Sequence, residues 1–158
     1  MALQRISSAL ITDATVATGD IADDAITAAK LDAAAMANGT FSGSVQFSGA
    51  VTLNEDTLSD GATVAWDVTA SPVAKLTLGG NRTLSAPSNA VGAGQYISLL
   101  VIQDGTGSRT LTWNAAYEFK DDTAPTLTTT ASKGDLFTFR YNGSKWLETG
   151  RNQNLTLS

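Results

Sequence analysis

The sequence contains no cysteine and no histidine among its 158 residues. Without cysteine the chain can form neither a disulfide nor a thiolate metal site. Without histidine it lacks the side chain that most often acts as a general base and as a transition-metal ligand. We therefore expect no catalytic residues, no bound metal, no cofactor and no enzymatic activity. A small protein without disulfides often gains its stability by oligomerisation instead.

Charged residues are scarce as well, at 16% of the chain, against about a quarter in typical domains. The formal net charge is −5 and no basic cluster is present, so the sequence lacks the electrostatic signature of binding to nucleic acid or to a membrane surface. No apolar run approaches the roughly 20 residues that span a bilayer, and the first residues lack the apolar core of a signal peptide. We expect no nucleic-acid partner, no membrane insertion and no export by a signal peptide.

Large apolar residues occupy every fifth position from the first residue onward: Met1, Ile6, Ile11, Val16, Ile21, Ile26, Leu31, Met36 and Phe41. A period of five matches neither an α-helix nor a β-strand. One copy of this segment has too little core to offset an ordering cost of about 1–2 kcal/mol per residue. Several copies wound together would bury the apolar row along a shared axis, so the pattern predicts a stalk segment over residues 1–40.

The repeat then changes to six residues, with FSGSVQ at 41–46 followed by FSGAVT at 47–52. Glycine permits a tight corner, and valine favours extended backbone. The pattern predicts a β stalk or neck over residues 41–59, with a simple β-hairpin as the alternative.

Residues 21–31, IADDAITAAKL, resemble repeats that are common in phage tail-fibre proteins, and residues 41–53 resemble the glycine-punctuated stalk repeats of the same proteins. Those proteins are usually parallel homotrimers. A competing similarity is to pentapeptide-repeat solenoids, which are single-chain square β-helices, although the residues beside the apolar positions do not keep their usual pairing. The fibre resemblance implies a trimer axis lined by Ile6, Ile11, Val16, Ile21, Ile26, Leu31, Met36, Phe41, Val45, Phe47 and Val51.

A compact β domain is expected from about residue 60. Short runs rich in Val, Ile, Thr and aromatic residues are separated by Gly, Asn, Asp and Pro clusters, which is typical of a sandwich or jelly roll. The predicted strands cover residues 62–68, 73–78, 95–103, 109–113, 126–130, 136–141 and 145–149. The expected fold class is mainly β, with an elongated N-terminal trimeric repeat stalk followed by a compact jelly-roll-like β-sandwich over 60–152 and a C-terminal tail over 153–158.

Two of these strands carry most of the information. Residues 96–102 are apolar at both alternating sets of positions, which predicts a central, largely buried strand. Residues 136–141 alternate, with their aromatic residues on one face, and lead into Asn142-Gly143, a strong hairpin signal. The returning strand is expected to bring Trp146 opposite Phe139.

Residues 62–152 resemble a small C-terminal β domain of phage fibre and tail-associated proteins. The similarity lies in LTLGGNRTL at 76–84, QDGTGSRTLTW at 103–113 and YNGSKW at 141–146. It implies a structural fibre or spike subunit on the exterior of a virion, made in the host cytoplasm, and it carries no known catalytic site. We expect the N-terminus to attach to other virion proteins and the β domain to point outward. The alternatives are a head fibre, a capsid decoration protein, a tail adaptor and an enzyme that degrades polysaccharide.

Several short motifs have both a chemical and a structural interpretation. Asp104-Gly105-Thr106-Gly107 could form a calcium loop or a tight turn, and Gly79-Gly80-Asn81-Arg82 could cradle phosphate or connect two strands. The acidic pairs Asp23-Asp24, Glu55-Asp56 and Asp121-Asp122 could supply a glycosidase dyad or solvated surface charge. In each case we expect the structural role. The calcium loop would have only one carboxylate, the glycine motif lacks the lysine and the following helix of a phosphate loop, and adjacent carboxylates rarely face each other across a cleft.

Aromatic side chains are candidates for stacking on sugars. Most of them lie in predicted strands and are expected in the core. Tyr117 and Phe119 precede Lys120-Asp121-Asp122 in a predicted loop. Tyr117 and Phe119 are therefore the best candidates for exposed rings, and together with Asp121 and Asp122 they are the candidate contacts to host surface polysaccharide.

Overall fold

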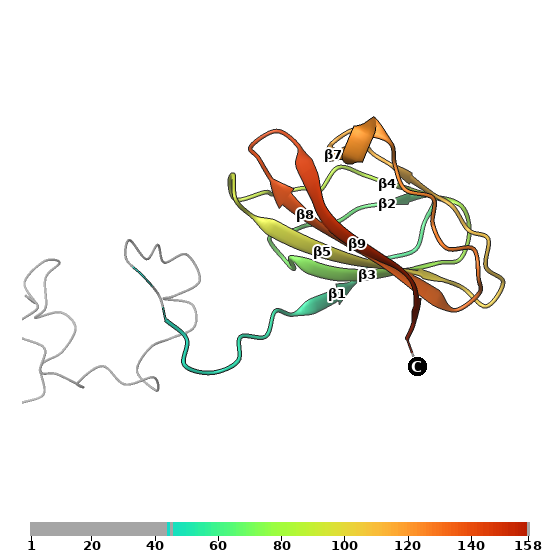
Figure 1. Ribbon diagram of the computed structural model, residues 1–158, viewed down its shortest axis with the longest axis horizontal. Coiled ribbons are helices and arrows are strands. Elements are labelled where there is room, and N and C mark those ends of the chain that lie inside the picture. Colours follow the sequence, from blue (N-terminus) through green and yellow to red (C-terminus); the bar gives the residue numbers. More distant parts are fainter. Residues whose placement is uncertain (1–43, 45, 158) are drawn as a thin grey trace, which may run out of the picture. The chain divides into compact units, whose positions relative to one another are not determined.

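The structure is a computed structural model that describes residues 44 and 46–157 (Figure 1). The chain divides into two compact units, Met1–Gly49 and Ala50–Ser158. The described residues of the first unit are exposed and form neither helix nor strand. The predicted stalk over 1–40, its pentapeptide-repeat alternative, Val45 and the axis positions up to Phe41 lie outside the described residues.

The second unit is mainly β, as predicted from the sequence. Its described residues form nine strands, labelled in order β1 (Glu55–Thr57), β2 (Thr63–Val64), β3 (Val73–Leu78), β4 (Arg82–Leu84), β5 (Tyr96–Gln103), β6 (Leu111–Trp113), β7 (Tyr117–Glu118), β8 (Lys133–Tyr141) and β9 (Trp146–Thr156). A short 3-10 turn, η4 (Lys120–Asp122), follows β7. No helix in this described part is both long and apolar enough to cross a membrane.

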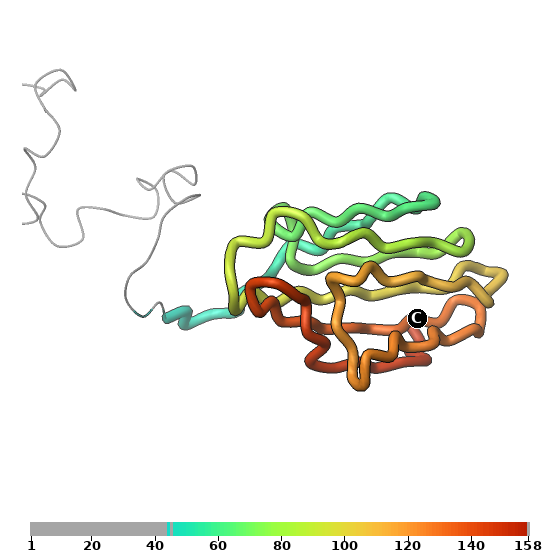
Figure 2. Tube along the Cα trace, turned by 90° about the horizontal axis from the view of Figure 1, so that it is seen from above, coloured from blue at the N-terminus to red at the C-terminus, as the bar shows by residue number. Residues whose placement is uncertain are grey.

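The first six strands alternate between two sheets. The larger sheet has the order β1-β3-β5-β8-β9-β7, and the smaller has the order β2-β4-β6. Neighbouring strands among β1, β3 and β5, and among β2, β4 and β6, run parallel. The chain therefore coils three times, placing one strand in each sheet per turn, and Figure 2 shows the turns stacked on one another.

This topology corrects the expected jelly roll, whose strands pair antiparallel in hairpins and Greek keys. Alternation of apolar and polar residues reports which face of a strand is buried, but it is the same for parallel and antiparallel neighbours. The two-layer arrangement was visible in the sequence pattern, whereas the direction of pairing was not.

The last strands pair antiparallel, with β8 lying between β5 and β9. Tyr141 is opposite Trp146, and Phe139 is opposite Glu148, so the predicted pairing of Trp146 with Phe139 is wrong. The reason is a four-residue connection in which the Asn142 side chain accepts hydrogen bonds from the backbone N–H groups of Ser144 and Lys145. Tyr141 instead packs on Trp146, with ring centroids 4.8 Å apart.

The domain extends beyond its predicted boundaries at both ends. β1 begins at Glu55 and pairs with β3, so the end of the predicted neck already belongs to the sheet. β9 continues to Thr156, which is paired with Lys133, so the predicted tail over 153–158 is largely strand. These edges were missed because neither segment carries an apolar alternation of its own.

The predicted strand at 126–130 is absent, since these residues form no sheet pairing. The backbone N–H of Thr128 instead donates to the buried Asp135 carboxylate at 2.7 Å, and Ser108 N–H donates to the Thr129 carbonyl. The β-branched threonines suited a strand, but side-chain and loop partners satisfy the backbone.

The core lies between the sheets. In β3 and β5, and from Asp135 to Phe139 of β8, every second residue is buried, and the apolar ones among these side chains meet Val64, Leu84 and Leu111 of the smaller sheet in one cluster. β5 has a hydrogen-bonded neighbour on each side, which confirms the central position predicted for 96–102. Trp113 sits among aromatic rings at centroid distances between 5.0 and 5.8 Å.

Candidate functional site

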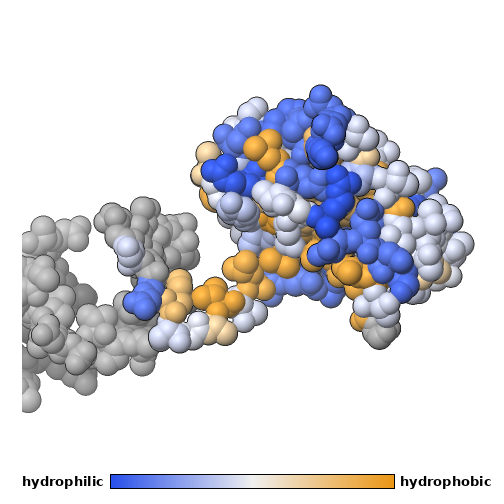
Figure 3. Space-filling model, viewed as in Figure 1, coloured by the Kyte–Doolittle hydropathy of each residue, from blue (hydrophilic) through white to orange (hydrophobic). Residues whose placement is uncertain are grey.

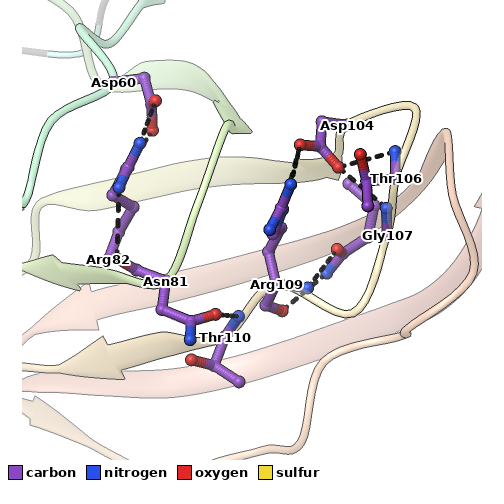
Figure 4. A network of polar contacts seen from close by, with 9 residues as sticks. Asp60, Asn81, Arg82, Asp104, Thr106, Gly107, Arg109 and Thr110 are labelled. Carbon is purple, nitrogen blue, oxygen red and sulfur yellow. Dashed lines mark hydrogen bonds and ion pairs between the residues drawn. The ribbon is translucent and has the colours of Figure 1, made fainter.

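Charged and amide side chains link the connections β1–β2, β3–β4 and β5–β6, which we call the first, second and third corners. At each corner the coiled chain crosses from the larger sheet to the smaller (Figure 4). Arg82, at the start of β4, donates from Nε and Nη2 to the two carboxylate oxygens of Asp60 at 2.7 and 2.6 Å. This bidentate pair joins the first corner, between β1 and β2, to the second corner, between β3 and β4. Asn81 Oδ1 then accepts the backbone N–H of Thr110 at 3.0 Å, which ties the second corner to the third.

The sequence Gly79-Gly80 has a steric role at this point. A Cβ on Gly79 would lie 2.8 Å from a carboxylate oxygen of Asp60, and one on Gly80 would meet the Arg82 guanidinium. The glycines therefore make room for the ion pair, and the 79–82 segment connects β3 to β4 as expected. Hydrogen bonding from Arg82 holds the pKa of the Asp60 carboxyl below its usual value and raises the pKa of Arg82.

Asp104 closes a tight turn, as the second interpretation of its motif predicted. One of its carboxylate oxygens accepts the N–H groups of Thr106 and Gly107, and the other accepts Arg109 at 2.9 and 3.0 Å. Arg109 and these N–H groups lower the pKa of Asp104. Donors within the protein therefore occupy both carboxylate oxygens of Asp104, which leaves neither oxygen free for a calcium ion. No cluster of metal-ligating side chains occurs among the described residues.

A pocket of about 270 Å³ opens beside β7 and η4. Its volume lies just below the range of about 300–1,000 Å³ common for small-ligand sites. Aromatic rings, an amide, two carboxylates and one ammonium group contribute to its wall. The lining residues are Trp113, Asn114, Ala115, Tyr117, Glu118, Phe119, Asp122, Ala124 and Lys145.

The turn after β6 and the parallel pairing of β7 with β9 position these residues. Asn114 accepts the N–H groups of Ala116 and Tyr117, which reverses the chain after Trp113. Tyr117 is paired with Trp146 across β7 and β9. Lys145, just before β9, donates to the Ala115 carbonyl at 2.5 Å and lies 3.3 Å from a Glu118 carboxylate oxygen.

Two residues of the pocket wall carry a buried polar atom that has no hydrogen-bond partner among the residues that the structure describes. These atoms are the indole Nε1 of Trp113 and the hydroxyl oxygen of Tyr117. Burial raises the pKa of Tyr117 well above its usual value, so the hydroxyl stays protonated and can act as a donor. A buried polar group without a partner is costly, which makes a ligand or water partner favourable here.

The structure corrects the exposure that we expected for two of the four candidate receptor residues. Tyr117 and Phe119 are only 4% and 8% exposed, because their rings pack on Trp113 and Phe139. Asp121 and Asp122 are exposed, with φ values of 55° and 53°. Asp122, Tyr117 and Phe119 all line the pocket, whereas Asp121 does not.

The remaining acidic pairs do not form a catalytic arrangement in the described part of the chain. Glu55 pairs with Lys75 at 2.8 Å on the exposed edge strand β1, where Asp56 is its neighbour. Asp121 and Asp122 are adjacent on a solvent-exposed turn. Asp23-Asp24 lies outside the described residues.

Sequence reasoning missed Trp113, Asn114, Glu118 and Lys145 as pocket residues. Trp113 was expected in the core, and it is in fact half-buried between core and pocket. Lys145 reaches the pocket only because β9 lies beside β7, a pairing of distant segments for which the local pattern gives no signal.

The fold defines a compact β domain whose charged side chains brace the corners between its strands. The family described as "Putative phage tail fibre C-terminal domain" matches residues 58–146, which is more than half of the chain and falls within the second unit. The chain therefore belongs to this family of phage tail fibre proteins and is part of the phage virion. A search of curated proteins finds no match to the chain.

Proposed function

We propose that the protein is a non-enzymatic structural subunit of a phage tail fibre, exposed on the outside of the particle. The family match over 58–146 carries this proposal, because it coincides with the described β domain. A head fibre, capsid decoration protein or tail adaptor has no comparable support. Microscopy of particles carrying a tagged copy distinguishes these locations, since the tag is expected on tail fibres and not on the capsid surface.

The subunit assembles as a homotrimer whose axis is lined by the regularly spaced apolar residues. Among the described residues of that row, Phe47 and Val51 are 68% and 59% exposed, as expected for side chains that only another copy can cover. Sedimentation of the full-length protein at micromolar concentration should give the mass of three chains. A monomer would contradict the proposal.

Charge placed in the apolar row should dissociate the trimer. The double variant Ile21→Asp, Ile26→Asp introduces unpaired carboxylates into a shared core, which is strongly unfavourable. The matched control Ala28→Asp, Ala33→Asp places the same two charges outside the row and should leave the mass unchanged. Equal behaviour of the two variants would show that the row does not face an interface.

The N-terminal segment attaches the subunit to other virion proteins, and the β domain points outward. Loops held on a rigid scaffold commonly carry binding surfaces, and the pocket beside β7 lies in such a loop region. Deletion of residues 1–19 should abolish incorporation into particles while leaving the β domain folded. If that variant still assembles onto virions and deletion of the last two residues prevents assembly, the polarity is reversed.

The pocket binds host surface glycan. Its carboxylates and amide can accept hydrogen bonds from sugar hydroxyls, and the Asn114 amide and the Lys145 ammonium group can donate them. Titration of the full-length protein with host polysaccharide should show binding that Asp122→Asn weakens and the surface control Asp56→Asn does not. The polysaccharide should keep its length throughout, and shortened products would contradict the non-enzymatic assignment.

A further inference from the structure

The two sheets present chemically different outer faces. On the smaller sheet, Thr63, Thr83 and Thr112 are in register across β2, β4 and β6, and all three are exposed. This is the polar outer face expected for a sheet in contact with water.

The outer face of the larger sheet is mixed instead: beside Lys75, Thr77, Ser98, Thr138 and Arg140 it carries a cluster of large apolar side chains. Leu100 of β5 is opposite Leu136 of β8, and Ile102 is opposite Gly134, which is opposite Leu155 of β9. Leu100, Ile102 and Leu136 alternate with buried residues, so they point away from the core, yet they are half-buried and not exposed, as is Leu155. The glycine leaves space on this face for two leucines, because a Cβ on Gly134 would lie 2.9 Å from Leu157 and 3.1 Å from Leu100.

A second apolar cluster lies on the same face, beyond the paired Ser98 and Thr138 and next to the segment that leads into β1. Leu53 is 55% exposed and Tyr96 is 60% exposed. Both line a groove of about 150 Å³ together with Val73 of β3 and Thr138 of β8. Figure 3 shows apolar surface beside the chain segment that precedes β1. Exposed apolar clusters close together on one face are typical of interaction sites.

We propose that this outer face of β3, β5 and β8 packs against the same face of other copies of the chain, around the axis of the fibre. The inference rests on the trimer proposed above and assigns the surface through which the β domains contact one another. Two observations favour a second copy as the occupant.

The first observation is continuity. The apolar row proposed to line the axis includes Val51, and Leu53 follows it two residues later. Leu53 lies in the groove with Val73 and Tyr96. Neighbouring copies that cover the exposed Val51 and Leu53 around the axis therefore also lie against this face of the sheet.

The second observation is charge. The whole chain carries a formal charge of −5, which disfavours random association of copies. On this face, however, Lys75 is paired with Glu55 at 2.8 Å, and the outward positions of β3, β5 and β8 carry no carboxylate, with the exposed Arg140 as their other charge. Copies can approach through this face without the repulsion that the acidic parts of the surface would impose.

Spin labels can test the orientation, because the chain has no native cysteine. Ser98→Cys places a label at the centre of the proposed face, and Thr83→Cys is the matched control on the smaller sheet. In a threefold assembly the separation of equivalent labels is √3 times their distance from the axis. Stacked sheets lie about 10 Å apart, so position 98 should be about 10 Å nearer to the axis than position 83. The separation between labels at position 98 should therefore be about 17 Å shorter than the separation between labels at position 83.

The mass of each labelled sample, measured by sedimentation, separates the two proposals. A trimer with clearly shorter separations at position 98, reproduced with Thr138→Cys, supports the assigned face. A trimer in which the separations at 83 are equal or shorter overturns the face while leaving the trimer intact. A monomer for the unlabelled parent protein overturns both the trimer and the face.

Discussion

Replacing Asp135 by alanine should lower the free energy of unfolding by about 2–4 kcal/mol. Asp135 is 2% exposed, and its carboxylate accepts Thr128 N–H at 2.7 Å, Asn154 N–H at 2.9 Å and Gln153 Nε2 at 3.3 Å. Alanine removes the acceptor but leaves the donors, and a buried donor without a partner costs about 1–3 kcal/mol. Thr128 is half-buried, whereas Asn154 and Gln153 are exposed and can bind water. The total cost is therefore smaller than three times the cost of one buried donor without a partner.

Urea denaturation followed by tryptophan fluorescence measures this change at one fixed protein concentration. Asp135→Asn keeps the side-chain volume but offers one acceptor oxygen instead of two, so it should cost about 1–2 kcal/mol. Asp56→Ala removes an exposed carboxylate from β1 and should stay within about 0.5 kcal/mol of the parent protein. If Asp135→Ala destabilises no more than Asp56→Ala, the buried carboxylate does not hold residues 126–129 and β9 together.

Three further predictions concern the corners and the core. Gly107→Ala should lower the urea midpoint, with a loss of more than about 1 kcal/mol, because φ at this residue is 74° and a Cβ would overlap neighbouring backbone; a neutral effect would contradict the turn geometry. Asp60 and Asp104 have a folded pKa below the ordinary 3.8, so their contribution to stability is complete above that pH and is lost as pH falls through the lower folded values. Arg82→Ala should therefore show a shallower loss of stability in this acid range, and an unchanged pH profile would refute the role of the ion pair. Trp146→Ala should cost about 3–5 kcal/mol and lower the thermal midpoint, since Trp146 is 2% exposed; a loss below 1 kcal/mol would contradict its place in the core.

The strands with strong alternation could be predicted from the sequence alone. The aromatic residues of 136–141 share the buried face of β8, and 96–102 forms the central strand β5. Their positions follow from burial, which local sequence encodes. The parallel coiling of β1 to β6 could not be predicted, because the two directions of pairing give the same alternation.

The candidate site was predictable only in part, for a related reason. The run from Tyr117 to Asp122 was found through its composition, and four of its residues line the pocket. Burial of Tyr117 and Phe119 depends on Phe139 of β8 and Trp113 of β6, contacts that no local pattern specifies. The partnership of Glu118 with Lys145 likewise requires the pairing of β7 with β9.

The central claim is that this chain is a tail fibre subunit whose β domain points away from the particle. Electron microscopy of purified particles, labelled with gold-conjugated antibody against residues 58–146, tests it directly. The account predicts gold at the outer ends of the tail fibres. Gold on the capsid, or only where the fibres join the tail, would contradict it.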